Sequence, residues 1–406
     1  MTSRAEPVLF ALIQFLFWSA LVTFEAFMVP YLRTEGYSPA EIGPIMGAVF
    51  GLAVVGQPLL GAVVDRVSSP KRVIAGALIV GGIAVVTVPA VVTWYNALFV
   101  TVLVYSVTAN SLPAVLDGWI MARREENPRV NFGIARGLGS AGFAVGGVSI
   151  GFIADRFGTP VIFPIYLALI VVTAGFVLRV PAVHRDRAGT GSTAGNLGLR
   201  GSFSFVRANI AAVISNKPYI FLVVASYLAF VGLRAALTFL PILVEELDGS
   251  VSDVGLAHSV AALSEIPFFF LSGLILLRMR GPVLVTALLA VLSVRLFSYT
   301  LLQTTTQLFV LQISHGLTFG LFLAATVDYI HRIAPPRHRS FFQALAPSVY
   351  FGLGSITGSW LGGVIIERFS TMVMYRSAAA IALAGTVVLS GAIIDQRRHD
   401  SSAADT

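Results

Sequence analysis

Long apolar stretches constrain this sequence more than any other feature. Twelve stretches are long enough to cross a bilayer, which needs about 20 mostly apolar residues. They cover approximately residues 8–32, 40–64, 73–93, 96–121, 132–154, 159–180, 217–244, 251–277, 282–303, 306–331, 341–366 and 371–394. Only 12% of all residues are charged and 56% are hydrophobic, whereas soluble domains carry roughly 25% charged residues. We therefore predict an all-α polytopic membrane protein with twelve transmembrane helices, surrounded by lipid.

The basic residues are concentrated in every second loop. One set of loops holds only Arg33, Arg156, Arg368 and Arg376, whereas the alternate loops and the C-terminal tail hold Arg66, Lys71, Arg72, Arg123, Arg124, Arg129, Arg278, Arg280, Arg332, Arg337, Arg339, Arg397 and Arg398. Loops rich in Lys and Arg stay in the cytoplasm, so we expect both termini there, in a bacterial inner membrane. The net charge of +7 is spread over many loops, which argues against a nucleic-acid partner.

A polar break divides the sequence into two parts. Residues 185–201 are rich in Gly, Ser and Thr, a composition typical of flexible linkers. An amphipathic pattern follows and predicts a segment lying on the membrane, with apolar positions Phe203, Phe205, Val206, Ile210, Val213 and Ile214. We expect an N-terminal six-helix half at 1–182, a cytoplasmic linker at 183–216 and a C-terminal six-helix half at 217–406.

The two parts repeat each other at a constant separation of 212 residues. The matching positions are Gly43 and Gly255, Gly61 and Gly273, Arg66 and Arg278, Gly151 and Gly363, Asp155 and Glu367. Two parallel repeats with a site between them at the membrane midplane are a known plan of secondary transporters. The repeat therefore predicts two pseudo-symmetric halves and transport of a small solute by alternating access.

Ionisable residues within the apolar stretches are candidates for function, because a charge inside the bilayer is costly. They are Glu25, Asp117, Arg136, Arg234, Glu265, Arg295, His315 and Asp328. Four carboxylates face three arginines, so the unmatched carboxylate is the natural proton carrier. Asp328 lies near a basic loop, and we expect it to pair with Arg332 instead of contacting substrate.

A short motif ends the second apolar stretch. Gly61 is followed four and five residues later by Asp65 and Arg66, which resembles the signature of the Major Facilitator Superfamily loop between helices 2 and 3. The resemblance implies the fold of that superfamily and assigns these three residues to a latch of the cytoplasmic gate. Leu277 takes the place of the aspartate in the second half, so the expected latch is one-sided.

Other motifs resemble particular branches of that superfamily. Asp117 and the run Phe132–Gly137, which contains Arg136, resemble the acid and arginine of the lactose permease. This implies that Asp117 and Arg136 bind the substrate, with Phe143 where that permease stacks an aromatic ring on its sugar. We add Glu25 and Arg234 to the predicted substrate site as intramembrane charges.

A second set of residues resembles the coupling residues of the lactose permease. Arg295 and His315 match its helix 9 arginine and helix 10 histidine, but Thr318 stands where that permease has an essential acid. The pattern at His315–Phe319 is more similar to the 3-phenylpropionate transporter family. The proton-coupling set is therefore predicted as Glu265, Arg295 and His315, with Glu265 as the leading proton carrier and Asp117 as the second.

Several functions stay open at this stage. Proton-coupled symport of a sugar or an aromatic or organic acid is favoured, because Phe143 replaces the proline of the antiporter motif G-P-x-x-G-G. A proton-coupled efflux antiporter and a non-transporting receptor or scaffold are the alternatives. The sequence holds no HExxH or CxxC motif, so we expect no enzyme. We also expect no cofactor and no metal, a monomer, and protons and a small molecule as partners.

Overall fold

The computed structural model describes residues 5–67, 69–181, 199–279 and 281–404, and within these ranges it contains helices and no strands. Twelve helices of this described part are long and apolar enough to cross a membrane, which confirms the predicted number. They are α1 (Glu6–Thr34), α2 (Pro39–Arg66), α3 (Pro70–Val91), α4 with α5 (Tyr95–Val107, Leu112–Glu126), α6 (Phe132–Phe157), α7 (Ile162–Arg179), α9 (Lys217–Thr238), α11 (Val251–Arg278), α12 (Gly281–Ser298), α13 with α14 (Thr305–Gln312, Leu321–Ile333), α15 with α16 (Arg339–Pro347, Gly354–Arg368) and α17 (Thr371–Ala404).

The repeat is visible in how matching helices begin. In α2 the Ser38 hydroxyl accepts a hydrogen bond from the Glu41 backbone N–H, and the Glu41 carboxylate accepts one from the Ser38 N–H. Ser250 and Asp253 form the same reciprocal pair at the start of α11. Such capping boxes satisfy donors that have no partner inside the helix. Each residue of the second pair comes 212 positions after its counterpart in the first pair.

The fourth span is broken near its middle. A 3₁₀ turn at Ala109–Ser111 separates α4 from α5. The side chain of Asn110 donates a hydrogen bond to the carbonyl of Val49, at 2.8 Å, and the Ser111 hydroxyl donates to that of Ala53, at 3.1 Å. These two hydrogen bonds attach the broken span to α2.

The tenth and eleventh spans contain π-helical turns. One covers Gly316–Gly320, between α13 and α14, and the other covers Ser348–Leu353, between α15 and α16. Such turns are often found at functional sites. Phe319 and Phe351, one from each turn, line the central cavity described below.

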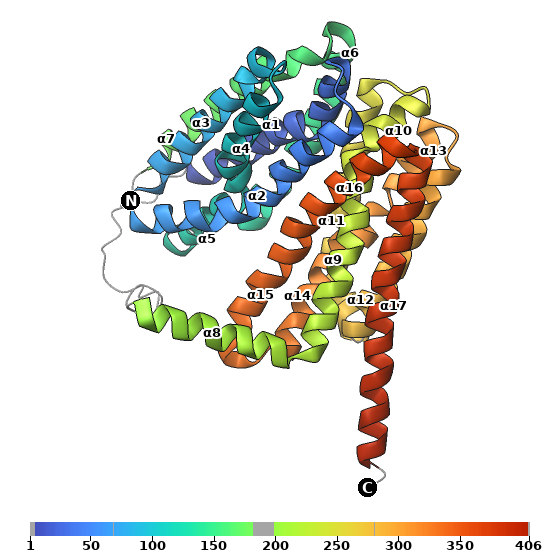
Figure 1. The fold of residues 1–406 in the computed structure, drawn as a ribbon. Coiled ribbons are helices and arrows are strands. Elements are labelled where there is room, and N and C mark those ends of the chain that lie inside the picture. Colours follow the sequence, from blue (N-terminus) through green and yellow to red (C-terminus); the bar gives the residue numbers. More distant parts are fainter. Residues whose placement is uncertain (1–4, 68, 182–198, 280, 405–406) are drawn as a thin grey trace.

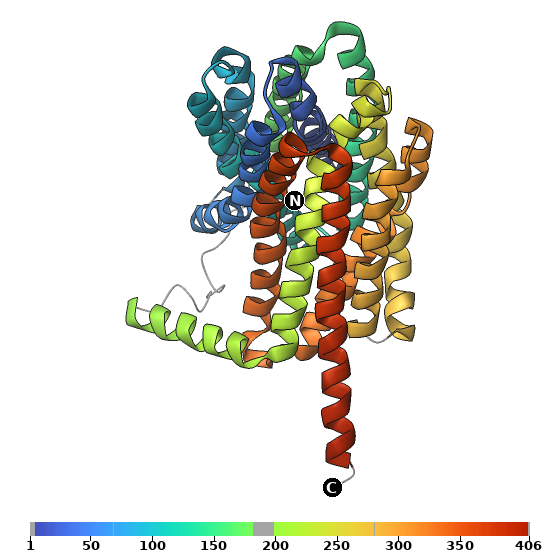
Figure 2. The same ribbon diagram turned by 45° about the vertical axis from the view of Figure 1, so that its right-hand side comes forward.

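The spans form two bundles, α1–α7 and α9–α17, which lean together at one end (Figure 1). We call the end that carries Glu6, Arg66 and Arg278 the terminal face, and the end with the loops at 35–38 and 247–250 the opposite face. Helix α8 (Leu199–Ser215) lies across the terminal face, and α17 projects beyond it (Figures 1 and 2). Asn209 of α8 contacts His338 through a 2.7 Å side-chain hydrogen bond, so α8 is attached to the second bundle.

The bundles touch mainly through two pairs of helices near the opposite face, α2 with α16 and α6 with α11. A Cβ on Gly255 of α11 would collide with the carbonyl oxygen of Gly147 of α6. One on Gly43 of α2 would collide with the carbonyl oxygen of Ser359 of α16. Small residues permit such close helix crossings in membranes, and these crossings close the opposite face.

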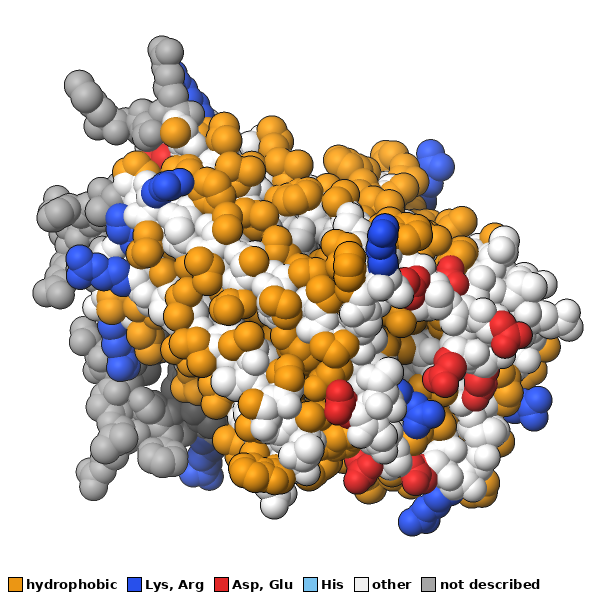
Figure 3. All heavy atoms as spheres, turned by 90° about the horizontal axis from the view of Figure 1, so that it is seen from above, with side chains coloured by type: hydrophobic (Ala, Val, Ile, Leu, Met, Phe, Trp, Pro, Cys, Tyr) orange, Lys and Arg blue, Asp and Glu red, His pale blue; other side chains and the backbone are white. Residues whose placement is uncertain are grey.

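The outer surface is largely apolar. Figure 3 shows hydrophobic side chains over much of the surface, with acidic side chains gathered toward one end of the view. Phe152, Leu274 and Val387 are each more than half exposed. A soluble protein rarely exposes contiguous apolar surface on this scale, so these side chains are suited to contact with lipid.

Candidate substrate and coupling site

One large cavity lies between the two bundles. Its volume is about 1040 Å³, and residues of both halves line it. Ser69, Lys71 and Gln343, near the helix ends of the terminal face, belong to its wall. Leu21, Met46 and other residues in the middle of their helices also line it. The cavity is therefore open toward the terminal face and closed toward the opposite face.

The first polar cluster on the cavity wall belongs to the N-terminal half. Arg136 on α6 belongs to the wall, and its Nε lies 4.0 Å from Oδ2 of Asp117 on α5, which is next to the wall without being part of it. The Arg136 guanidinium lies 4.3 Å from the ring centroid of Trp18 on α1, a cation–π distance. Phe143 meets the same indole at 6.3 Å between ring centroids. The structure thus brings together three predicted substrate residues, and adds Trp18 to them.

The second cluster lies where the two halves meet. Arg234 of α9 places its guanidinium carbon 3.4 Å from the ring centroid of Phe50 on α2, and its Nε donates to the Ser355 hydroxyl at 3.2 Å. Glu25 of α1 lines the same cavity and interacts electrostatically with Arg234. No ion pair within 4.0 Å joins these two charges among the described residues.

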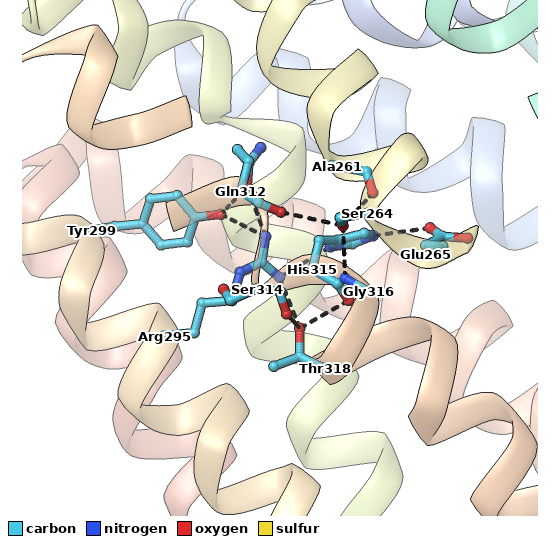
Figure 4. Close-up of polar contacts among 10 residues, drawn as sticks. All are labelled: Ala261, Ser264, Glu265, Arg295, Tyr299, Gln312, Ser314, His315, Gly316 and Thr318. Carbon is cyan, nitrogen blue, oxygen red and sulfur yellow. Dashed lines mark hydrogen bonds and ion pairs between the residues drawn. The ribbon is translucent and has the colours of Figure 1, made fainter. Parts of the chain in front are cut away.

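The third cluster belongs to the C-terminal half and contains all three predicted coupling residues (Figure 4). His315 Nε2 lies 3.3 Å from the Glu265 carboxylate, and His315 Nδ1 lies 3.0 Å from Nη1 of Arg295. Arg295 is 2% exposed and also donates to Gln312 at 2.7 Å and to Tyr299 at 3.0 Å. The imidazole of His315 therefore stands between Glu265 and Arg295.

This geometry defines the state of the histidine. A guanidinium can only donate hydrogen bonds, so Nδ1 of His315 accepts from Arg295 and carries no proton. The proton of the neutral imidazole is then on Nε2, from which it is donated to Glu265. The three residues form one chain, from the buried arginine through the histidine to a carboxylate on the cavity wall.

The charge balance of the cavity differs from the sequence-based count. Arg332 binds Asp328 through its Nη2 at 3.2 Å, as predicted, and Asp328 is not part of the cavity wall. Of the intramembrane charges identified in the sequence, three carboxylates and three arginines are left in and behind the wall, and Lys71, Arg123 and Glu126 also line the cavity. The expectation of one unmatched carboxylate was therefore wrong, because the fourth acid, Asp328, is neutralised by Arg332 outside the cavity. Any proton carrier must come from one of the balanced clusters.

The predicted gate residues lie at the terminal-face end of α2. Gly61 lines the cavity, and a Cβ added to it would meet no atom within 4 Å. Arg66 is exposed. The side chain of Asp65 lies outside the part of the chain that the structure describes. The latch that these residues are expected to form belongs to a closed terminal face, so it stays a prediction.

Four polar or aromatic residues of the site were missed: Gln14, Trp18, Phe50 and Gln312. Their positions in apolar helices carry no charge signal, and an aromatic residue in a membrane helix usually faces lipid or a neighbouring helix. The one usable signal was the spacing of Gln14 and Trp18, which places both on one face of α1.

Two pseudo-symmetric six-helix halves around a cavity that carries charged clusters and opens to one face define an integral membrane protein of the secondary transporter class. Residues 9–377 match the MFS_1 like family, and the chain belongs to that family of Major Facilitator Superfamily transporters. This confirms the superfamily resemblance. The narrower likeness to the 3-phenylpropionate branch stays a prediction.

Similar proteins of known name include transporters for different solutes. The maltose permease of Geobacillus stearothermophilus is 26% identical over 389 residues, covering 95% of this chain and 94% of the permease. The putative nucleoside transporter YegT of Escherichia coli (strain K12) is 24% identical, covering 84% of this chain and 81% of YegT. The crystal structure of the nucleoside transporter NupG has the same fold, with a TM-score of 0.78 at 20% identity, over 94% of this chain and 96% of NupG.

Proposed function

We propose that this transporter imports a neutral, hydroxyl-bearing ring compound, a sugar or a nucleoside, together with protons. The observation that carries the proposal is the pair of Asp117 and Arg136 beside the indole of Trp18. The 4.0 Å gap between the two charges is too long for a direct hydrogen bond. A substrate hydroxyl between them can donate to the carboxylate and accept from the guanidinium, while the ring packs on Trp18 or Phe143.

The charge balance of the cavity supports a neutral substrate. Each arginine of the three clusters has an acid in its own cluster: Asp117 with Arg136, Glu25 with Arg234, and Glu265 with Arg295 through His315. An organic acid would bring an additional negative charge to these balanced clusters, and a buried unpaired charge is costly. The relatives named as maltose permease and putative nucleoside transporter agree with a neutral ring.

Coupling to protons is proposed at Glu265. Its carboxylate faces the cavity, where a proton can be taken up from water, and it accepts a hydrogen bond from His315. A protonated Glu265 is a weaker acceptor for the imidazole, so the link between α11 and the π-helical turn after His315 loosens. This supplies a local change at a helix contact that alternating access can use.

The orientation and boundaries belong to the same proposal. The excess of Lys and Arg at the terminal face favours a cytoplasmic position for it, in a bacterial inner membrane, with the two termini inside. The cavity of this structure then faces the cytoplasm. We also propose a monomer divided at 1–182, 183–216 and 217–406, with α8 lying along the membrane surface.

A ligand screen tests the proposal. Purified protein is heated with maltose, uridine or 3-phenylpropionate, and its unfolding temperature is recorded. A ligand at 100 times its Kd raises the free energy of unfolding by about 2.7 kcal/mol. We expect a shift with a sugar or nucleoside that disappears in Asp117→Asn. A shift with the carboxylate alone would overturn the neutral-substrate proposal.

A further inference from the structure

Gln14 has no role in the proposed function, although it forms hydrogen bonds with two residues of the proposed substrate site, Asp117 and Trp18. It lies on α1 and is 1% exposed. Its Nε2 donates a hydrogen bond to Oδ1 of Asp117, at 2.9 Å, and its Oε1 accepts one from the indole N–H of Trp18, at 2.8 Å. An indole nitrogen can only donate and a carboxylate only accepts. The two neighbours therefore fix which end of the amide is oxygen and which is nitrogen.

This bridge sets the geometry of the whole N-terminal cluster. One oxygen of Asp117 is occupied by Gln14, so the other oxygen, Oδ2, is the one near Arg136. The same amide holds the indole of Trp18 in place under the Arg136 guanidinium. Gly139 of α6 leaves the necessary room, because a Cβ there would collide with Trp18 and approach Oε1 of Gln14.

We propose that Gln14 is the positioning residue of the substrate site, a role that rests on the proposed function. It does not touch the substrate. It holds the carboxylate that binds a hydroxyl and the aromatic ring that packs on the substrate in one fixed relation, across α1 and α5. Replacing it leaves both groups present but uncoupled, so the site loses affinity without losing any direct contact.

Three variants test this role. Gln14→Met keeps the volume of the side chain and removes both hydrogen bonds, and we expect the Kd for uridine or maltose to rise about tenfold.

Gln14→Glu places a second carboxylate beside Asp117 on α5, with Arg136 on α6 as the nearby positive charge. Once protonated, Glu has one donor and one acceptor, as the amide does. Its binding relative to the wild type should recover at acid pH, whereas that of Gln14→Met should not. Gln307→Met, at the start of α13 on the opposite face, is the matched control.

A second readout needs no substrate. Trp18 is made the single tryptophan by changing Trp94, Trp119 and Trp360 to phenylalanine, and its fluorescence anisotropy is measured. Gln14→Met should lower the anisotropy, since the indole loses its anchor. Unchanged anisotropy together with unchanged Kd would overturn the role of Gln14. If the wild type binds no sugar or nucleoside, the proposed function fails, and the anisotropy alone then decides whether Gln14 positions Trp18.

A different observation concerns the closed opposite face. Asp155, in the last turn of α6, accepts a hydrogen bond from the backbone N–H of Ser252 at the start of α11, at 3.0 Å. Glu367, in the last turn of α16, accepts one from the N–H of Ala40 at the start of α2, at 3.3 Å. Each bond joins one half to the other. Both the acids and the donors are 212 residues apart, so the two contacts are related by the internal repeat.

The donors are those that the capping boxes leave free. In α2 the box uses the N–H groups of Ser38 and Glu41, and Ala40 between them has no partner within its own helix. The equivalent position in α11 is Ser252. A carboxylate at such a position is favoured both by the hydrogen bond and by the positive end of the helix dipole.

We infer that Asp155 and Glu367 form a paired latch that holds the opposite face closed. When the cavity opens to that face, α2 must separate from α16 and α11 from α6, so both bonds break. Each contributes only a small stabilisation at an exposed position, which suits a gate that must also open.

Accessibility of the cavity from the opposite face tests the latch. Met46→Cys, in a chain without native cysteines, is treated with a membrane-impermeant thiol reagent applied to that face. Adding Asp155→Ala and Glu367→Ala together should raise the labelling rate about fivefold or more, with each single change giving less. Asp155→Asn and Glu367→Gln keep an acceptor oxygen and should give intermediate rates. Glu245→Ala, an acid of the same face outside these contacts, is the control. Equal rates in the double alanine variant and the control would overturn the latch.

Discussion

Arg234 and Phe50 form a contact between the two halves at the centre of the cavity. The guanidinium carbon of Arg234, on α9, lies 3.4 Å from the ring centroid of Phe50, on α2. Cation–π contacts out of bulk water contribute about 2 kcal/mol. Because α2 and α9 belong to different halves, this contact can stabilise one arrangement of the halves over the other.

The first prediction follows from that contact. Phe50→Leu removes the ring and should shift the population toward the conformation with a closed terminal face, by about 1–2 kcal/mol. Spin labels at Ser69 and Arg337, on the two sides of the cavity mouth, report the change as a growing short-distance population. Phe297→Leu, an exposed phenylalanine of α12, serves as the control. An unchanged distance distribution in Phe50→Leu would count against the role of the contact.

The second prediction separates two aspartates that look alike in the sequence. Asp117 lies beside Arg136, a residue of the cavity wall, whereas Asp328 pairs with Arg332 away from the wall. Asp117→Asn should weaken substrate binding about tenfold to a hundredfold, because it removes a charge-assisted hydrogen bond. Asp328→Asn should leave the Kd unchanged. Calorimetry on the two purified variants measures both values, and equal losses would refute the assignment.

The third prediction concerns orientation. Ser69 lies at the terminal face, and Asn96 near the start of α4 lies at the opposite face. Single cysteines at these positions should react with impermeant reagents from opposite sides of the membrane, Ser69→Cys from the cytoplasm and Asn96→Cys from outside. Labelling of both from one side would contradict the proposed topology.

The fold could be predicted from the sequence because lipid imposes long apolar helices, and because the repeat leaves the same residues at matching helix ends. The breaks within the membrane spans could not be predicted from the sequence. The turn at Ala109–Ser111 depends on hydrogen bonds to α2, and the π-helical turns at Gly316–Gly320 and Ser348–Leu353 depend on packing. Such tertiary contacts have no local sequence signal.

The site could be predicted in part, and charge explains which part. Arg136, Glu265 and His315 stand out in apolar stretches and lie on the cavity wall, and Asp117 stands out in the same way and lies beside Arg136. The sequence cannot show that His315 separates Glu265 from Arg295, since that depends on how three helices meet. Gln14 and Trp18 were missed because neutral side chains in an apolar helix give no comparable signal.

The central claim is that Glu265 couples protons to import. Glu265→Gln imitates the protonated carboxyl, so it should keep substrate binding and exchange of labelled for unlabelled substrate across the membrane. It should lose accumulation against a gradient, because it has no proton to release. Binding and exchange in the variant also show that it is folded.

The most direct measurement is uptake of labelled substrate into proteoliposomes under an imposed pH gradient. The wild type should raise the internal concentration above the external one, whereas Glu265→Gln should stop at equal concentrations. Accumulation by Glu265→Gln to the level of the wild type would contradict the account and make Asp117 the next candidate for the proton carrier.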